Sequence, residues 1–160
     1  MEQCKITNMY DLNETIAKEY METAEYPWEL LDGLSDYIKK LGATLDPEKY
    51  EKRGEDVWVA KNANVAPTAF LGSPLIIDEE GEVRHCSAIV GKGAVVGNST
   101  ELKNVILFNK VQVPHYNYVG DSILGYKAHM GAGSITSNVK SDKTLVVVRD
   151  GKEEIATGRK

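Results

Sequence analysis

The chain has 160 residues, of which 42% are hydrophobic and 27% charged, with a net charge of −5; this composition is typical of a globular domain that buries its own core. It contains no apolar run near the ~20 residues of a membrane-spanning helix and no apolar stretch behind a basic start, so we expect no membrane partner, no signal peptide and a cytoplasmic location. The acidic balance argues against a nucleic-acid partner, and two cysteines, Cys4 and Cys86, are too few for a disulfide framework and not spaced for zinc.

Charge divides the chain into two unequal parts. Residues 1–60 contain 14 acidic and 7 basic residues, whereas residues 61–160 contain 10 acidic and 12 basic ones. This asymmetry indicates two kinds of structure, and it leaves room for a small anionic ligand in the second part. We expect a helical N-terminal segment with a connector at 1–57, a repeat at 58–140 and a C-terminal arm at 141–160.

The N-terminal segment begins with a predicted helix. Leu12, Ile16 and Tyr20 recur at the spacing of one helical face. Asp11 or Asn13 would cap the start of this helix, because a short polar side chain can accept a hydrogen bond from the free backbone N–H groups there.

A second helix is better marked than the first. Pro27 suits a first helical position, and Gly42 follows the last apolar residue as a stop signal. The apolar stripe of this helix consists of Trp28, Leu31, Leu34, Ile38 and Leu41. We expect the stripe to pack against the rest of the protein; a separate partner-binding helix is the alternative. Residues 43–57 are polar and are predicted to be a connector.

From residue 60 onward an apolar residue recurs with a period of six. Nine of the twelve steps between successive anchors are six residues long; the exceptions are one step of seven and two of five. The anchors, apolar except for the last, are Val65, Leu71, Ile77, Val83, Val90, Val96, Leu102, Leu107, Val113, Val119, Leu124, Met130 and Thr136. This period is typical of a parallel β-helix, in which three hexads close one coil and the anchors point inward. We therefore expect a mainly β protein of about four coils, with the helices as a cap for the first coil. A β-sandwich of short strands is the alternative.

The period ends after Asn138, and a different signal follows. Residues 144–148 and 153–157 are β-prone runs on either side of Asp150 and Gly151, and Asp-Gly between such runs is a strong hairpin signal. We expect a β-hairpin arm that projects from the coils.

Three motifs within residues 96–138 carry a family resemblance. VGNSTELKN, PHYNYVGDS and GAGSITSN occur in one order without a gap. This segment resembles the C-terminal acetyltransferase domain of the bifunctional N-acetylglucosamine-1-phosphate uridyltransferase/glucosamine-1-phosphate acetyltransferases, in the branch carried by sugar-1-phosphate nucleotidylyltransferases. The resemblance implies a left-handed β-helix, a homotrimer with sites between subunits, acetyl-CoA as co-substrate and no metal. No nucleotide-binding domain precedes the repeat, so we expect no uridyltransferase activity.

The resemblance also implies roles for individual residues. His115 occupies the position of the catalytic histidine, and histidines, which ordinarily titrate near pH 6.5, suit the removal of a proton from an attacking sugar amine. Lys103 matches the lysine that holds the sugar phosphate, Tyr118 matches a substrate-contacting tyrosine, and Asn138 matches an asparagine near the sugar. The positions that fit close approach of the thioester or pantetheine arm are Gly131, Ala132 and Gly133.

Three features depart from the family. His85 aligns with an arginine that grips the phosphate, and a local shift in the seven-residue step would bring the adjacent Arg84 into that substrate-binding position. His129 stands at an asparagine of the family site. The family continues with further coils that bind coenzyme A, whereas this sequence ends at Lys160. We therefore expect the acceptor half of the site and not the donor half.

Three functions remain open from the sequence. The first is N-acetyl transfer from acetyl-CoA to a glucosamine-1-phosphate-like acceptor, with His115 as general base. The second is a non-catalytic trimeric module that binds a sugar phosphate or a sugar nucleotide. The third is a metalloenzyme like the γ-class carbonic anhydrases, which share the fold; however, the spacing of His85, His115 and His129 does not match the close histidine pair of that family.

Overall fold

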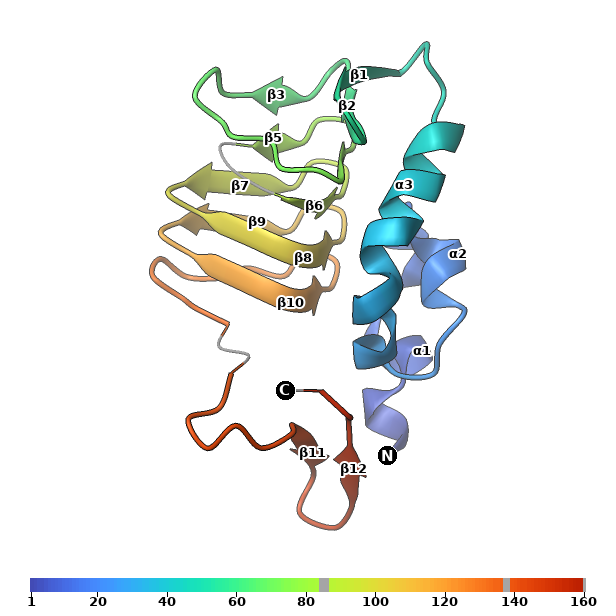
Figure 1. Ribbon diagram of the computed structural model, residues 1–160, viewed down its shortest axis with the longest axis vertical. Coiled ribbons are helices and arrows are strands. Elements are labelled where there is room, and N and C mark those ends of the chain that lie inside the picture. The colour runs from blue at the N-terminus through green and yellow to red at the C-terminus, as the bar shows by residue number, and fades with distance from the viewer. Residues whose placement is uncertain (84–86, 137–138, 160) are drawn as a thin grey trace.

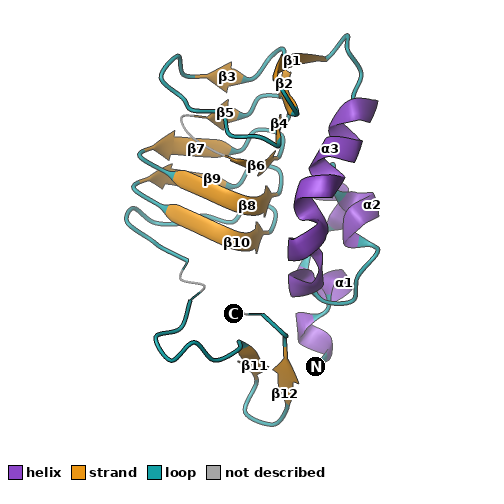
Figure 2. Cartoon of the chain, in the orientation of Figure 1, coloured by secondary structure: helices purple, strands orange, loops and turns teal. Residues whose placement is uncertain are grey.

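The computed structural model of the protein describes residues 1–83, 87–136 and 139–159. A stack of short parallel strands forms a left-handed β-helix of about four coils, a layer of helices covers one flank of the stack, and a small hairpin lies beyond the last coil (Figure 1). Figure 2 shows that the helices are confined to the N-terminal segment. The predicted fold class is confirmed. Within the described ranges, none of the helices is long and apolar enough to cross a membrane.

The N-terminal segment consists of short helical turns. The 3-10 helices are η1 (Glu2–Cys4), η2 (Leu12–Glu14) and η3 (Pro27–Gly33), and the α-helices are α1 (Ile6–Met9), α2 (Lys18–Met21) and α3 (Leu34–Thr44). The helix expected across residues 12–20 is broken at Thr15, whose buried hydroxyl accepts a hydrogen bond from the Ala17 N–H at 3.1 Å. Asp11 does cap the first turn, accepting from the Asn13 N–H at 3.0 Å. Local side-chain bonds here replace the continuous helical ladder.

The second helix runs past the expected stop. It begins at Pro27, as predicted, and ends at Thr44 rather than at Gly42. Gly42 lies inside the last turns, buried directly beneath the indole ring of Trp58, where a side chain would overlap the ring. The glycine therefore permits close packing of α3 on the coils, which is a tertiary role. Leu34 and Ile38 are buried, so the stripe packs inward as expected.

Two parallel sheets make up the walls of the coils. The larger one contains, in spatial order, β1 (Tyr50–Gly54), β2 (Val57–Ala60), β4 (Leu75–Ile77), β6 (Ser87–Val90), β8 (Glu101–Leu107) and β10 (Tyr118–Leu124). The smaller one contains β3 (Asn64–Val65), β5 (Glu82–Val83), β7 (Val95–Asn98) and β9 (Gln112–His115). All neighbours are parallel except β1, which pairs antiparallel with β2.

Strand β1 corrects two expectations: that residues 43–57 are a connector without regular structure, and that the helices cap the first coil. It lies within the stretch predicted to be a connector, and it extends the sheet edge at the first coil. The Tyr50 hydroxyl donates a hydrogen bond to the buried Asp78 carboxylate and so ties β1 to the coils. The helices lie along the flank, from Trp58 in the first coil to the last strand, where the Tyr10 hydroxyl donates to the Ile123 carbonyl at 3.3 Å. Strand β1 thus lies at the edge of the sheet in the first coil, and the helices cover the flank of the stack of coils (Figure 1).

The strand register explains the irregular steps of the repeat. Val90 aligns with Leu107, and Leu107 with Leu124, each 17 residues on, whereas Ile77 aligns with Val90 after only 13 residues. The seven-residue step therefore lies in a short coil. The two five-residue steps contain Asn104 and Asp121, both with positive φ. These two corners stack: the Asn104 amide donates to Asp121 at 2.7 Å and to the Leu31 carbonyl of η3 at 3.2 Å.

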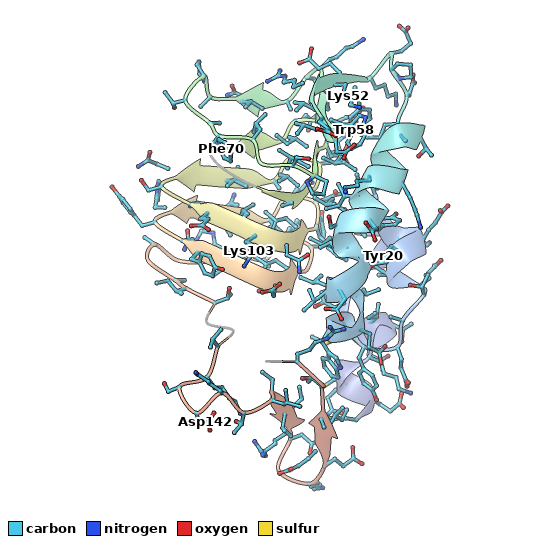
Figure 3. The ribbon with its side chains drawn as sticks, viewed as in Figure 1. Tyr20, Lys52, Trp58, Phe70, Lys103 and Asp142 are labelled. Atoms are coloured by element: carbon cyan, nitrogen blue, oxygen red, sulfur yellow. The ribbon has the colours of Figure 1, made fainter. Side chains whose placement is uncertain are left out.

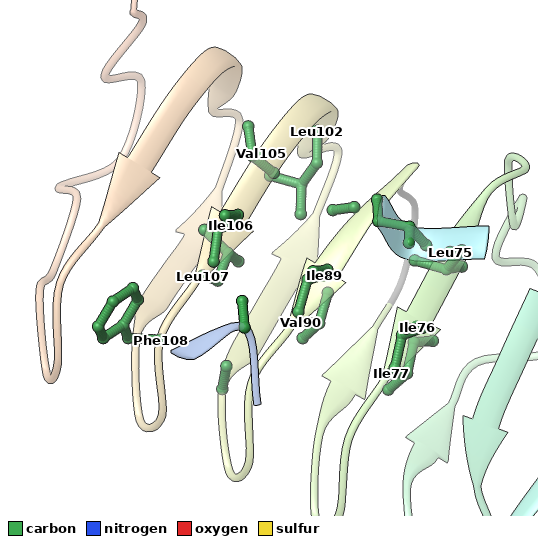
Figure 4. Packing of buried hydrophobic residues seen from close by; sticks show 14 of the residues in the cluster. Leu75, Ile76, Ile77, Ile89, Val90, Leu102, Val105, Ile106, Leu107 and Phe108 are labelled. Atoms are coloured by element: carbon green, nitrogen blue, oxygen red, sulfur yellow. The ribbon is translucent and has the colours of Figure 1, made fainter. Parts of the chain in front are cut away.

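The anchors and the helical stripe share a continuous core. Ile77, Val90 and Leu107 stack on successive coils, and each is fully buried (Figure 4). Phe108 is also fully buried, and its ring centroid lies 5.3 Å from that of Tyr10 in the helical segment. Phe108 therefore joins the coils to the helices.

Replacing Phe108 with alanine is expected to lower the free energy of unfolding by about 3–5 kcal/mol, because the loss of the ring opens a cavity between two packed layers. Urea denaturation followed by circular dichroism measures this change. Val139→Ala is the control: that side chain is 68% exposed, so its truncation should cost only about 0.5 kcal/mol. Equal losses for the two variants would contradict the described packing.

The C-terminal arm is a hairpin, as predicted, of β11 (Val147–Arg149) and β12 (Glu154–Ala156). It folds back onto the N-terminal segment instead of projecting freely. Gln3 donates to Asp150 at 2.7 Å, and the N-terminal ammonium lies 3.1 Å from the Glu153 carboxylate. Arg159 forms an ion pair with Asp32, and this guanidinium lowers the pKa of the Asp32 carboxyl.

Candidate functional site

The outer surface of β8 and β10 brings two of the predicted site residues together. Leu102 aligns with Val119, and both side chains are buried inside the coil. Because side chains alternate along a strand, Lys103 and Tyr118, on either side of this pair, point outward. The exposed Lys103 is visible on this surface in Figure 3.

Gly120 determines how Tyr118 lies on this surface. It pairs with Lys103 across the two strands. A methyl group on Gly120 would lie 2.6 Å from the Tyr118 hydroxyl oxygen and 2.9 Å from Cζ of its ring. The tyrosine ring therefore lies across Gly120, directed along the strand toward the position beside Lys103. The phenol and the ammonium thus share one surface, which we call the Lys103–Tyr118 face.

His115 stands at the corner where this face begins. It is the last residue of β9, is paired with Asn98 of β7, and is exposed. Tyr116 follows with φ of 53°, which turns the chain toward β10 and Tyr118. The turn places an exposed imidazole at the edge of the Lys103–Tyr118 face.

The glycine motif lies in the next coil, directly beside His115. The Gly133 N–H donates to the His115 carbonyl at 3.1 Å. Gly133 has φ of +77°, a backbone conformation that favours glycine. Gly131 has no such requirement, since a methyl on it would meet no atom nearer than the Ser134 hydroxyl oxygen at 3.9 Å. The structure thus places the segment of Gly131, Ala132 and Gly133 against the candidate base.

Not all candidates gather at this face. His129 forms a bridge with Gln112, and its Nδ1 lies 3.0 Å from the Gln112 Oε1. This position continues the sheet of β9, so His129 lies on a different wall from Lys103 and Tyr118. Arg84 and Asn138 lie outside the described residues, and so do His85 and Cys86.

Asn117 is a residue that the sequence did not single out. Its side chain is only 3% exposed, and it accepts a hydrogen bond from the His115 N–H at 3.1 Å. It donates to the carbonyls of Gly131 at 2.8 Å and Ser134 at 3.2 Å. An asparagine in the turn PHYNY is an ordinary turn residue by sequence. Its burial becomes apparent only in the structure, where the next coil covers it.

A cavity beside the Lys103–Tyr118 face lies between the coils and α3. Its volume is about 330 Å³, and it is lined by Ser35, Ile38, Pro74, Lys103, Asn104 and Asp121. A larger cavity of about 600 Å³ lies between the last coil, η3 and the hairpin, and Gly120 and Thr136 connect it to the same face. In the described part of the chain, no three His, Cys, Asp or Glu side chains are grouped as metal ligands would be.

Known proteins resemble this chain over most of its length. The bifunctional protein GlmU of Methanococcus aeolicus is 30% identical over 157 residues, and that of Methanococcus maripaludis strain S2 is 27% identical over 138 residues. These matches cover 84% and 82% of this chain but 34% of each relative. The GlmU of Synechococcus sp. strain CC9605 is 34% identical over 99 residues, covering 58% of this chain and 22% of the relative.

The chain thus spans about a third of the length of the two Methanococcus relatives, and no protein-family model matches it. The similarity agrees with the hexad repeat and with the three motifs between residues 96 and 138. The resemblance to the hexapeptide-repeat acetyltransferase domain of the GlmU proteins is therefore confirmed.

Proposed function

We propose that the protein transfers an acetyl group from acetyl-CoA to the amine of an amino-sugar 1-phosphate, with glucosamine-1-phosphate as the model acceptor. One observation carries the proposal: Lys103 and Tyr118 share one outer face of the coils, and His115 stands at its corner. The similarity to acetyltransferase-like GlmU proteins supports the same chemistry. Such a reaction would place the protein in the cytoplasm.

Each of these residues has a defined part in the proposed reaction. The Lys103 ammonium pairs with the sugar phosphate, and Tyr118 offers the sugar its ring and hydroxyl. The amine nitrogen bonds to the acetyl carbonyl carbon, and the carbon–sulfur bond of the thioester breaks. His115 takes the proton that the amine loses and returns it to the departing thiolate. By resemblance, Arg84 and Asn138 are further acceptor ligands.

A homotrimer with sites between subunits fits the surface around His115. Tyr116 is 65% exposed and Ile135 is 67% exposed, and Ile135 pairs with Tyr118 on the last coil. Exposed apolar side chains that form a contiguous patch mark protein–protein contacts, and we propose that these two belong to such a patch. In such an assembly His129, which lies on a different wall, would reach a substrate only across a subunit boundary. Sedimentation equilibrium should give three times the chain mass; a monomer would contradict this assembly.

The proposal is tested by incubating the protein with acetyl-CoA and glucosamine-1-phosphate. The acetylated sugar should be detected by mass, because the thiols of Cys4 and Cys86 would react with a thiol reagent. N-acetylglucosamine-1-phosphate formed in proportion to protein supports acetyl transfer. Binding of glucosamine-1-phosphate without product would indicate a non-catalytic sugar-phosphate module instead. No binding at all would overturn the proposed acceptor.

A further inference from the structure

The buried amide of Asn117 connects the candidate base to the next coil. Its oxygen accepts from the His115 N–H, and its nitrogen donates to the Gly131 and Ser134 carbonyls. The Asn117 carbonyl also accepts from the Glu101 N–H at 2.9 Å, in the coil before. One residue therefore spans three successive coils at the corner that carries His115.

A second hydrogen bond joins His115 to the same turn. The Gly133 N–H donates to the His115 carbonyl, so the backbone of His115 is held on both of its polar groups. Both bonds lead to the turn at 131–134, either directly or through Asn117. By the resemblance, this turn contains the glycine segment that the thioester or pantetheine arm would approach. The Asn117 amide thus helps to hold the backbone of His115 in place relative to that turn.

We infer that Asn117 is a positioning residue for acetyl transfer, which holds His115 in register with the 131–134 turn without touching either substrate. The inference rests on the proposed function. A displacement of about 1 Å of a catalytic group lowers rates by about 10²-fold, because the reacting atoms no longer meet in line. The register of this corner should therefore influence turnover more than substrate binding.

Asparagine fits the hydrogen-bonding groups at this position better than side chains of similar size do. The site needs one acceptor, for the His115 N–H, and two donors, for the Gly131 and Ser134 carbonyls, and a primary amide supplies all three. An aspartate of the same shape has only acceptors, so it would face both carbonyls without a proton to share. A serine keeps one acceptor and one donor on a shorter side chain.

Asn109 provides a matched control at a different corner of the coils. Its side chain also links coils, because its oxygen accepts from the Lys92 N–H at 3.0 Å and its amide donates to Glu14 at 3.1 Å. It follows β8 and precedes β9, and its carbonyl accepts from the Lys127 N–H rather than from the turn at 131–134. Its loss should weaken the fold without moving His115.

The test compares Asn117→Ala, Asn117→Ser and Asn109→Ala in the full chain, below the unfolding temperature of each. For Asn117→Ala we expect kcat to fall at least 10-fold while KM for glucosamine-1-phosphate changes less than 3-fold, with a smaller fall for the serine variant. Amide hydrogen exchange at the His115 N–H should become at least 10-fold faster. Asn109→Ala should keep kcat within 2-fold.

Two results would overturn the inference. One is an Asn117→Ala protein with wild-type kcat, and the other is an Asn109→Ala protein that loses kcat to the same degree. If the alanine variant does not fold, a serine variant that folds with unchanged kcat would overturn it equally. Wild-type protein that forms no product would instead contradict the proposed function, and the inference would fall with it.

Discussion

Replacing His115 with alanine is expected to lower the rate of acetyl transfer by about 10²- to 10⁴-fold, the usual contribution of a positioned general base. The imidazole stands exposed at the corner of the Lys103–Tyr118 face, and its backbone is fixed from both sides. Without it, the amine must lose its proton to water. The measurement is kcat/KM for glucosamine-1-phosphate, with the acetylated product quantified by mass.

The matched control for this variant is Lys110→Ala. Lys110 is an exposed side chain at another corner, with its ammonium 5.9 Å from the centroid of the Tyr126 ring. Its loss should leave kcat/KM within 2-fold. A His115→Ala protein that transfers acetyl groups within 3-fold of the wild-type rate would show that His115 is not the base.

Gly97→Ala is expected to destabilise the coils by about 3 kcal/mol or more. Val96 of β7 aligns with Val113 of β9, so Gly97 lies opposite Pro114 in the next coil. A methyl group at Gly97 would overlap the backbone carbonyl of Pro114, and neither coil can move without breaking the ladder around it. Overpacking of this kind usually costs 1–3 kcal/mol, and a backbone obstacle raises that cost. Thermal and urea unfolding measure the loss.

Gly131 offers a control in the same column of the stack. A methyl group there would meet only the Ser134 hydroxyl oxygen, at 3.9 Å. Gly131→Ala should therefore leave the free energy of unfolding within about 0.5 kcal/mol of wild type. If both variants were equally stable, the close stacking of β7 on β9 would be wrong.

The sequence predicted the coils well because their period is set by geometry. Each wall needs one inward apolar residue, so Val90, Leu107 and Leu124 appear in the sequence at the spacing at which they stack. The short coil could not be predicted from the sequence. The length of one step, here seven residues, does not show how many steps make up the coil that contains it. Only the alignment of Ile77 with Val90 shows this.

The failures in the N-terminal part have a common physical cause. Gly42 carries a local stop signal, but packing against Trp58 overrides it. Strand β1 is polar and mostly exposed, so it shows no apolar alternation, and it exists only because β2 offers an edge. In each case a contact distant in sequence decides the local structure.

The candidate site was predictable in its residues but only partly in its arrangement. The family resemblance indicated His115, Lys103 and Tyr118, and the register places the last two on one face. His129 was named with them but lies on a different wall. The role of Asn117 depends on its burial by the next coil, which no local pattern encodes.

The central claim, that the Lys103–Tyr118 face binds a sugar phosphate, is tested most directly by calorimetric titration of glucosamine-1-phosphate into wild type, Lys103→Ala and Lys110→Ala. Hydrogen bonds to a charged group contribute about 1.5–3 kcal/mol, so Lys103→Ala should weaken binding by about 10- to 100-fold. Lys110→Ala should bind as wild type does, and glucosamine without the phosphate should bind far more weakly. Equal affinity of wild type and Lys103→Ala for the sugar phosphate would contradict the claim.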